Sequence, residues 1–202
     1  MNISNRKNIN IEESKITVIG FGRSGEGAAL LGHYLGANMF ISDGGSTDTM
    51  VESGKKLEAF GIQIETGGHT EKIYNTDLWV VSPGIAQDAE IVLNAKAKSI
   101  PIVSEIEFAS WFTDAPIISL TGSNGKTTSV HLLNKMCQTE SLSPALSGNV
   151  GTAFSEIVLA DLKDKPVNRI HVLEISSFQM EHIVHFKPLI SVFLNITPDH
   201  LD

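Results

Sequence analysis

A short apolar run that leads directly into a glycine-containing loop constrains the fold of this chain more than any other feature. The run Ile117–Leu120 is followed by Thr121-Gly122-Ser123-Asn124-Gly125-Lys126-Thr127-Thr128 and then by a segment with helical spacing. Glycines let consecutive backbone N–H groups turn toward one anion, and the N-terminus of the following helix adds positive potential. The pattern therefore predicts a strand, a phosphate-binding loop and a helix, as in a nucleotide-binding α/β domain.

The side chains of this loop point to ATP as its ligand. We expect Lys126 to reach the β- and γ-phosphates and the hydroxyl of Thr127 to ligate Mg²⁺. Leu120 occupies the first glycine position of the usual G-x-x-x-x-G-K-[ST] pattern, so a glycine turn that only starts a helix is the alternative. The predicted ATP-binding residues are Gly122, Ser123, Asn124, Gly125, Lys126, Thr127 and Thr128.

A second glycine loop, Gly20-Phe21-Gly22-Arg23-Ser24-Gly25, follows the apolar run Lys15–Ile19 and opens a helical segment. Asp43 closes the next apolar run about 20 residues later, where a dinucleotide site has its ribose-binding acid. Taken alone, this pattern predicts a site for NAD, FAD or another nucleotide diphosphate. The alternatives are a purely structural strand–helix turn for the loop and a loop-capping role for Asp43.

Short runs rich in Val and Ile alternate with longer mixed segments, the pattern of a parallel sheet covered by helices. The predicted strands are Lys15–Ile19, Met39–Ser42, Leu78–Ser82, Pro101–Val103, Ile117–Leu120, Arg169–Glu174 and Leu189–Asn195. The predicted helices are Gly25–Leu35, Thr49–Phe60, Asp88–Lys98, Lys126–Cys137 and Thr152–Ala160. Because each glycine loop implies its own site, we expect two domains, residues 1–104 and 105–202, that join near Ser104–Ala115.

Composition excludes some classes of function. The chain has 202 residues, 42% hydrophobic and 19% charged, and its net charge of -8 argues against a nucleic-acid-binding protein. No apolar run approaches the roughly 18 residues that span a bilayer, and the polar N-terminus is unlike a secretory signal. We therefore predict a cytoplasmic protein without membrane insertion. The single cysteine, Cys137, allows no intrachain disulfide, and its spacing from Leu132 and Met136 predicts a core position.

With both loops in view, the chain resembles the Mur ligases of peptidoglycan synthesis. The stretches that carry the resemblance are Gly20–Gly25, Ser82-Pro83-Gly84-Ile85-Ala86, Thr121–Thr128, Gly148-Asn149-Val150-Gly151, Leu173–Gln179 and Asn195–Asp202. The short spacing of the ATP loop is also the form found in this family. The resemblance implies an α/β fold: a Rossmann-like N-terminal domain with a parallel sheet, then part of a P-loop-type ATPase domain.

The resemblance also implies the reaction, an ATP-dependent amide-bond ligation. The γ-phosphate of ATP passes to the terminal carboxylate of UDP-N-acetylmuramoyl-L-alanine, and the amine of D-glutamate attacks the acyl phosphate. D-glutamate is implied because Ser82–Ala86 and Leu173–Gln179 resemble the member that adds it. The chain stops directly after a predicted strand, so we expect a front fragment, inactive by itself, of a monomeric enzyme. The C-terminal domain that binds most of the amino acid is then absent.

The roles of individual residues follow from the same resemblance. Glu174 ends an apolar strand where nucleotide-binding sheets present an acid to Mg²⁺, although it could instead cap a following helix. The implied catalytic residues are Lys126, Asn149, Glu174 and His200, and the implied metal ligands are Thr127, Glu174 and His200. The implied UDP-substrate residues are Gly20, Gly22, Arg23, Ser24, Gly25, Asp43, Ser82, Pro83, Gly84, Asn149, Ser177 and Gln179.

Three rival interpretations differ from this one. An NAD(P)-dependent oxidoreductase would explain only Gly20–Gly25 and would leave the ATP loop and Glu174 without a role. A noncatalytic nucleotide-binding module fits a chain that lacks the amino-acid domain. A sister ligase that adds another amino acid is the third, because the residues present do not select the amino acid.

Overall fold

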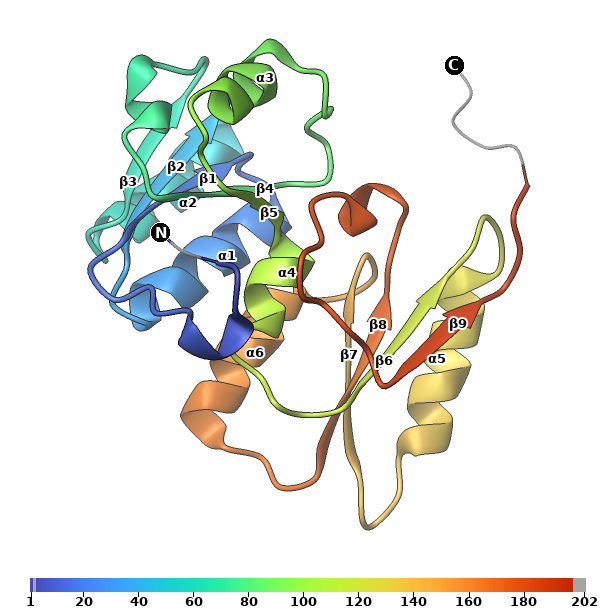
Figure 1. Cartoon of the computed structure of the whole chain (residues 1–202). Coiled ribbons are helices and arrows are strands. Elements are labelled where there is room, and N and C mark those ends of the chain that lie inside the picture. Colours follow the sequence, from blue (N-terminus) through green and yellow to red (C-terminus); the bar gives the residue numbers. More distant parts are fainter. Residues whose placement is uncertain (2, 198–202) are drawn as a thin grey trace.

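The computed structural model describes residue 1 and residues 3–197, and it contains two parallel sheets (Figure 1). The first sheet has the order β3 (Gln63–Thr66), β2 (Asn38–Asp43), β1 (Lys15–Ile19), β4 (Leu78–Val81), β5 (Ile102–Ser104). The second has the order β7 (Ser143–Gly148), β8 (Arg169–Glu174), β6 (Ile117–Thr121), β9 (Ile190–Phe193). The predicted α/β fold class with parallel sheets is confirmed.

Helices separate most of the strands. The α-helices are α1 (Arg23–Tyr34), α2 (Asp48–Glu58), α3 (Glu90–Ala97), α4 (Glu105–Ser110), α5 (Lys126–Cys137) and α6 (Phe154–Asp164). Short 3-10 helices are η1 (Arg6–Asn8), η2 (Glu71–Tyr74) and η3 (Phe178–Met180). Figure 1 shows α6 and α5 on opposite sides of the second sheet.

The central strands bury side chains on both faces, which explains their continuous apolar runs. In β8, Val172 packs on the α5 side, whereas Leu173 belongs to the core on the α6 side. In β4, Val80 belongs to the core that contains residues of α1, whereas Trp79 packs on the opposite face with residues of α3. Successive strand side chains point to opposite faces, so a strand covered on both sides needs apolar residues at every position.

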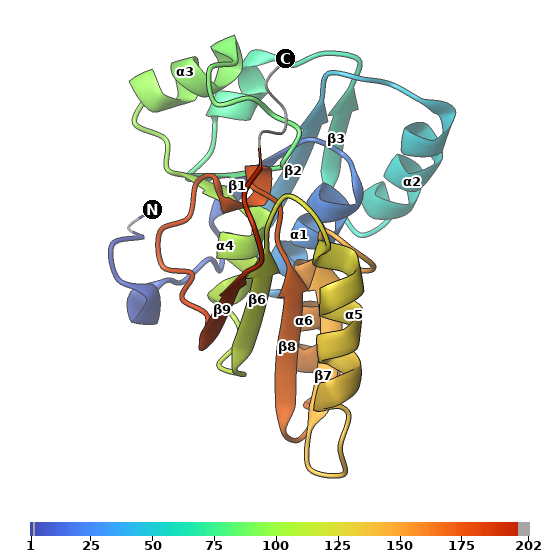
Figure 2. The same cartoon turned by 90° about the vertical axis from the view of Figure 1, so that its right-hand side faces the viewer.

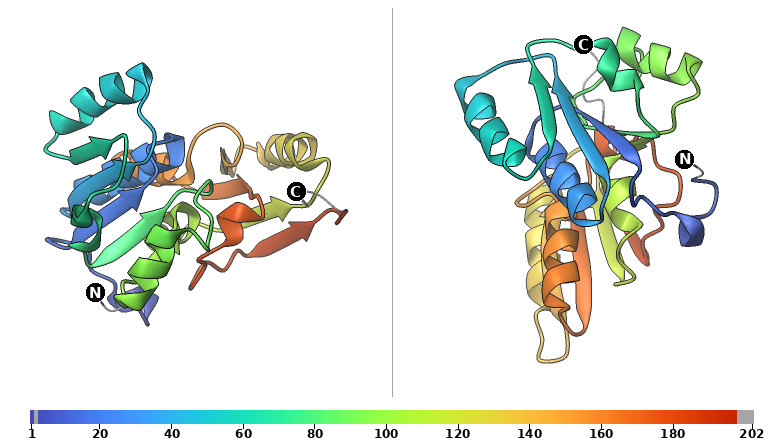
Figure 3. Two further views of the ribbon diagram at one scale, coloured as in Figure 1. Left: turned by 90° about the horizontal axis from the view of Figure 1, so that it is seen from above. Right: turned by 90° about the vertical axis from the view of Figure 1, so that its left-hand side faces the viewer.

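One hydrophobic core connects the two sheets. It runs from strand residues such as Val18 through α1 and α4 to Phe154 and Val158 of α6, and on to Leu173. The right-hand view of Figure 3 shows α1, in blue, lying against α6, in orange. The strands divide between residues 15–104 and 117–193, but the helices between the sheets pack as one layer. The division into domains at residues 104 and 105 stays a prediction.

Some elements differ from the predictions. Every predicted strand is present, with ends that agree to within two residues, but the edge strands β3 and β7 were not predicted. Strand β7 has the sequence Ser-Pro-Ala-Leu-Ser-Gly, and its proline is tolerated because the strand lies at the sheet edge. Helix α4 occupies the expected join, and α6 continues to Asp164 rather than ending at Ala160.

The predicted core position of Cys137 is wrong. Leu132 and Met136 of α5 are 61% and 70% exposed, and Cys137 itself is only partly buried. Val130 is the buried residue of this helix and Leu133 packs beside it, so α5 packs on the second sheet through the face of Val130 and Leu133, while Leu132 and Met136 point away from it. Over the described residues, no helix is both long enough and apolar enough to cross a membrane.

Candidate nucleotide sites at the carboxyl ends of the two sheets

The phosphate loop has the backbone geometry that its glycines allow. It connects the end of β6 to α5, and Gly122 and Gly125 adopt φ values of +147° and +80°. Side-chain-bearing residues rarely adopt such angles. A Cβ at Gly122 would also lie 3.1 Å from the carbonyl oxygen of Asn195. Glycine is therefore required at this position both by conformation and by space.

The segment after β9 fixes the loop from one side. The amide of Asn124 donates to Oδ1 of Asn195 at 2.9 Å, and Nδ2 of Asn195 donates to the carbonyl of Asn124 at 3.0 Å. The amide of Thr197 donates to Oγ of Ser123 at 2.9 Å. These bonds tie the loop to the segment after β9, and residues of both border one cavity. Figure 2 shows β6 beside β9.

Lys126 lies across the phosphate loop. Its Nζ donates to the carbonyls of Gly122 and Ser123 at 2.6 Å and 3.0 Å. The loop borders a cavity of about 410 Å³, the phosphate-loop cavity. Its lining residues come from β6 and the loop, from the segment after β8 and from the segment after β9: Thr121, Gly122, Ser123, Lys126, Ser176, Ser177, Phe178, Phe193, Asn195, Ile196 and Thr197. Thr127 and Thr128 are exposed in the first turn of α5.

Glu174 lies at the carboxyl end of β8, beside the start of the phosphate loop. The register pairs it with Leu120 of β6 and Gly148 of β7, and it is only 1% exposed. Its Oε1 accepts a hydrogen bond from Nδ2 of Asn149 at 2.8 Å, whereas its buried Oε2 has no hydrogen-bond partner among the described residues. A helix-capping role is wrong for Glu174, because the next helical turn, η3, has Ser177 as its N-cap.

The surroundings of Glu174 fit a magnesium ion. Buried carboxylate oxygens without partners are rare, and a hard cation is a natural partner for one. Mg²⁺ commonly uses one or two carboxylates together with phosphates and water. The described residues contain no cluster of three or more His, Cys, Asp or Glu side chains that could hold a metal ion. His200, the other predicted ligand, lies outside the described residues.

The first glycine loop lies at the carboxyl ends of β1, β2 and β4. Gly20 has a φ of +100°, and its carbonyl accepts from Oγ of Ser82 at 3.2 Å. Asp43 accepts from the amides of Phe21 at 2.5 Å and Gly45 at 2.7 Å, one on each carboxylate oxygen. The structure therefore brings Gly20, Asp43 and Ser82 together, with Asp43 joining two loops.

The remaining residues predicted for the first loop differ in their surroundings. The space beside Gly22 is open, whereas a Cβ on Gly25 would collide with the carbonyl of Gly20. The guanidinium of Arg23 donates to the carbonyl of Gly151, next to the loop that carries Asn149. Ser24 is partly buried in the first turn of α1. Arg23, which follows a strand of the first sheet, thus contacts a loop that follows a strand of the second sheet.

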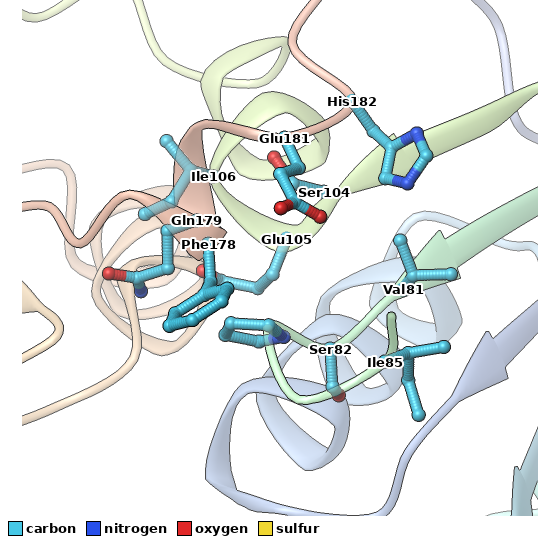
Figure 4. Close-up of a pocket in the computed structure, with 11 residues that line it drawn as sticks. Val81, Ser82, Ile85, Ser104, Glu105, Ile106, Phe178, Gln179, Glu181 and His182 are labelled. Carbon is cyan, nitrogen blue, oxygen red and sulfur yellow. The ribbon is translucent and has the colours of Figure 1, made fainter. Parts of the chain in front are cut away.

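Between the sheets lies a small pocket, the inter-sheet pocket, shown in Figure 4. Its lining residues are Val81, Ser82, Pro83, Ile85, Ser104, Glu105, Ile106, Phe178, Gln179, Glu181 and His182. Gly84 lies in the turn closed by the bond from the amide of Ile85 to the carbonyl of Ser82. Gln179 is 3% exposed, and its Oε1 accepts from the amide of Ser176 at 3.0 Å. Ser177 lines the phosphate-loop cavity, whereas Gln179 lines the inter-sheet pocket.

Sequence reasoning missed two buried acids on α4. Glu105 accepts from the amide of Ser155 at 2.6 Å, and its other oxygen is buried without a partner among the described residues. Glu107 is fully buried and binds the chain near His185. One signal was available, because Ser104 and Glu107 have the spacing of a capping box. Oγ of Ser104 does accept from the amide of Glu107 at 3.2 Å.

Comparison with known proteins identifies the family. Residues 15–91 match the MurD N-terminal domain, and residues 120–202 match the Mur ligase middle domain. The chain belongs to the Mur ligase family. The UDP-N-acetylmuramoylalanine--D-glutamate ligase of Christiangramia forsetii is 42% identical over 190 residues, which are 93% of this chain and 41% of that protein. The ligase of the same name from Chlorobium chlorochromatii is 40% identical over 198 residues, 96% of this chain and 41% of that protein.

This Mur ligase chain therefore spans about two fifths of the length of the curated relatives it matches. A solved structure with a similar fold is the UDP-N-acetylmuramate:L-alanyl-gamma-D-glutamyl-meso-diaminopimelate ligase from Neisseria meningitides. Its TM-score is 0.57 at 19% identity, over 94% of this chain and 62% of that one. A murein peptide ligase from Psychrobacter arcticus gives a TM-score of 0.56 at 20% identity, over 92% and 44% of the two chains. Both similarities concern the fold.

Proposed function

We propose that this chain forms the two nucleotide-binding parts of an ATP-dependent ligase that adds D-glutamate to UDP-N-acetylmuramoyl-L-alanine. Residues 1–104 bind the UDP-substrate, and residues 105–202 bind ATP. The observation that carries the proposal is the convergence of Lys126, Glu174 and the glycine loop at one end of the second sheet. The names of the relatives supply the substrate and the amino acid.

In this proposal the phosphate loop binds and orients ATP. Its amides and the N-terminus of α5 bind the phosphate oxygens. The ammonium group of Lys126 leaves the loop carbonyls to which it donates and binds the γ-phosphate instead. Bound Mg²⁺ would be held by Glu174 and Thr127 and would neutralise charge on the transferred phosphoryl group. Asn149 fixes the orientation of Glu174 through its bond to Oε1. Ser177 lies in the same cavity, where it can contact the reacting carboxylate.

The first glycine loop binds the diphosphate of the UDP-substrate. The open space beside Gly22 leaves room for the phosphates at the start of α1. Asp43 accepts one backbone amide on each carboxylate oxygen, so it shapes the loop that would meet the diphosphate. The Ser82–Gly84 turn completes the rim. The proposal has three further parts. A further domain binds D-glutamate, the full-length enzyme is a monomer, and it is located in the cytoplasm.

Calorimetric titration tests the proposal at its first site. The chain is titrated with UDP-N-acetylmuramoyl-L-alanine and, separately, with NAD⁺. We expect the UDP-substrate to bind and NAD⁺ not to bind. We also expect Gly22→Val to abolish binding of the UDP-substrate without loss of the fold, because Gly22 has a φ of -90° and an open environment. Binding of NAD⁺ without binding of the UDP-substrate would overturn the proposal.

A further inference from the structure

Glu107 is a buried carboxylate whose oxygens are fully used. Oε1 accepts from Nε1 of Trp111 at 2.6 Å and from the amide of His185 at 2.7 Å. Oε2 accepts from the amides of Val184 at 3.0 Å and Phe186 at 2.7 Å. Glu107 itself is 0% exposed. A buried carboxylate that accepts from several N–H donors forms strong, charge-assisted bonds with fixed geometry.

Three of these donors are backbone amides of one segment, and the side chains of Ile183 and Phe186 in that segment also pack against the core. Residues 181–189 connect η3 to β9 and contain no helix or strand. Close to them, the carbonyl of His182 accepts from the amide of Ser104 at 3.3 Å. Nε2 of His185 also donates to the carbonyl of Ile3 at 2.6 Å. The backbone amides at Val184, His185 and Phe186 therefore depend on Glu107 for their buried partners.

The acceptor lies at the junction between the two sheets. Helix α4 follows β5 of the first sheet and leads to β6 of the second. It packs against α1 and α6 and contacts η3. Glu107 thus ties the connection between β8 and β9 to the helical layer that both sheets share.

The segment just before this anchor borders both candidate sites. Ser177 and Phe178 line the phosphate-loop cavity, whereas Phe178 and Gln179 line the inter-sheet pocket with Ser82 (Figure 4). Beyond the anchor, β9 leads to Asn195, which holds the phosphate loop. A shift of residues 184–186 would therefore move residues that line both cavities.

We propose that Glu107 is a positioning residue that holds Ser176–Gln179 in place between the two nucleotide sites. This role rests on the proposed function, since it assumes that ligands occupy these sites. The carboxylate is required because a glutamine offers a single acceptor oxygen. Its NH₂ group would face two N–H donors, either the amides of Val184 and Phe186 or, after an amide flip, the amide of His185 and the indole of Trp111, so at least one amide of the segment would lose its acceptor. Glu107→Gln therefore keeps the shape of the side chain and removes half of the anchor.

The test combines amide hydrogen exchange with ligand titration for Glu107→Gln and a matched control, Trp111→Phe. The control removes the indole donor together with one ring of the buried Trp111 side chain, and it leaves the backbone amides bonded to Glu107. For Glu107→Gln we expect amides at residues 176–179 and 184–186 to exchange roughly tenfold faster, and the Kd for UDP-N-acetylmuramoyl-L-alanine to rise roughly tenfold. For Trp111→Phe we expect both quantities to stay within about twofold.

All titrations are done well below the unfolding midpoints, so that a loss of global stability does not change the Kd. A lower midpoint for Glu107→Gln with unchanged Kd and unchanged exchange at residues 176–179 would overturn the inference. If the unsubstituted chain binds neither nucleotide, the proposed function fails, and exchange at residues 176–179 alone decides the positioning role. If Glu107→Gln does not fold, Glu107→Asp carries the same measurements, since it keeps the charge on a shorter side chain.

Discussion

Three buried glutamates differ in how many hydrogen-bond partners their carboxylate oxygens have. Glu107 has partners for both oxygens, whereas Glu174 and Glu105 each have one oxygen without a partner among the described residues. The sequence predicted Glu174 because it ends an apolar strand next to a nucleotide loop. Glu105 and Glu107 escaped prediction because their partners lie 50 and 77 to 79 residues away along the chain.

Removal of the charge at Glu174 is expected to uncouple ATP binding from Mg²⁺. The unpaired oxygen beside the phosphate loop is the proposed metal ligand, so chelation of Mg²⁺ should weaken ATP binding to the unsubstituted chain. In Glu174→Gln the effect of Mg²⁺ on the Kd should shrink by about tenfold or more. Fluorescent-ATP titrations with and without Mg²⁺ measure both values. An unchanged Mg²⁺ effect would remove Glu174 from the metal site.

The pH dependence of stability should change at Glu105. Burial raises the pKa of Glu105 to about 7 from its ordinary 4.5, despite the hydrogen bond from Ser155. The folded state thus holds this proton more tightly than the unfolded state, and ionisation costs stability as the pH rises from 4.5 through 7. Glu105→Gln should therefore be more stable than the unsubstituted chain at pH 8, by up to about 3 kcal/mol.

The difference should shrink as the pH falls toward 5, where the buried carboxyl is protonated in the folded state. Urea unfolding at several pH values gives the free energies. Glu12→Gln removes one exposed carboxylate and serves as the control for net charge. A stability difference that is the same at pH 5 and pH 8 would show that ionisation of Glu105 is not responsible.

At the scale of elements, apolar pattern predicted the central strands well and the edges poorly. Strands β1 and β8 have their predicted bounds, because burial on both faces demands continuous apolar runs. Edge strand β3 has the sequence Gln-Ile-Glu-Thr, which gives no such signal. Helical spacing in α5 indicated an apolar face but not what covers it, and Leu132 and Met136 are exposed.

The first glycine loop offers a matched pair of substitutions. A Cβ at Gly25 would collide with the carbonyl of Gly20, so Gly25→Ala must push α1 away from the loop. We expect a loss of about 1–3 kcal/mol in the free energy of unfolding and much weaker binding of the UDP-substrate. Gly22→Ala points into open space and should change stability by less than about 0.5 kcal/mol. Urea unfolding of both variants checks this, and equal stabilities would contradict the close contact between α1 and the loop.

For the whole molecule, the sequence predicted the fold class correctly but not the shared core, and the two nucleotide sites stay a prediction. The packing of α1 on α6 depends on close approach: a Cβ at Gly27 would lie 2.6 Å from Oγ of Ser155. Such a contact joins distant parts of the chain and leaves no local pattern. The expected join near Ser104–Ala115 therefore contains a packed helix and not a simple linker.

The shared core predicts that both sheets unfold together. Phe154 is fully buried in the cluster that contains residues of both sheets. Phe154→Ala should lower the free energy of unfolding by about 3–5 kcal/mol while the transition stays single. Amide exchange of β1 reports on the first sheet, and amide exchange of β8 reports on the second. Separate midpoints for these two probes would contradict a single cooperative core.

We propose that one chain carries two distinct nucleotide sites, one at the carboxyl end of each sheet. The most direct test is a calorimetric cross-titration of Gly22→Val and Lys126→Ala with UDP-N-acetylmuramoyl-L-alanine and Mg-ATP. We expect Gly22→Val to lose binding of the UDP-substrate and keep binding of Mg-ATP, and Lys126→Ala to lose binding of Mg-ATP and keep binding of the UDP-substrate. Loss of both ligands in either variant, with the fold intact, would contradict two separate sites.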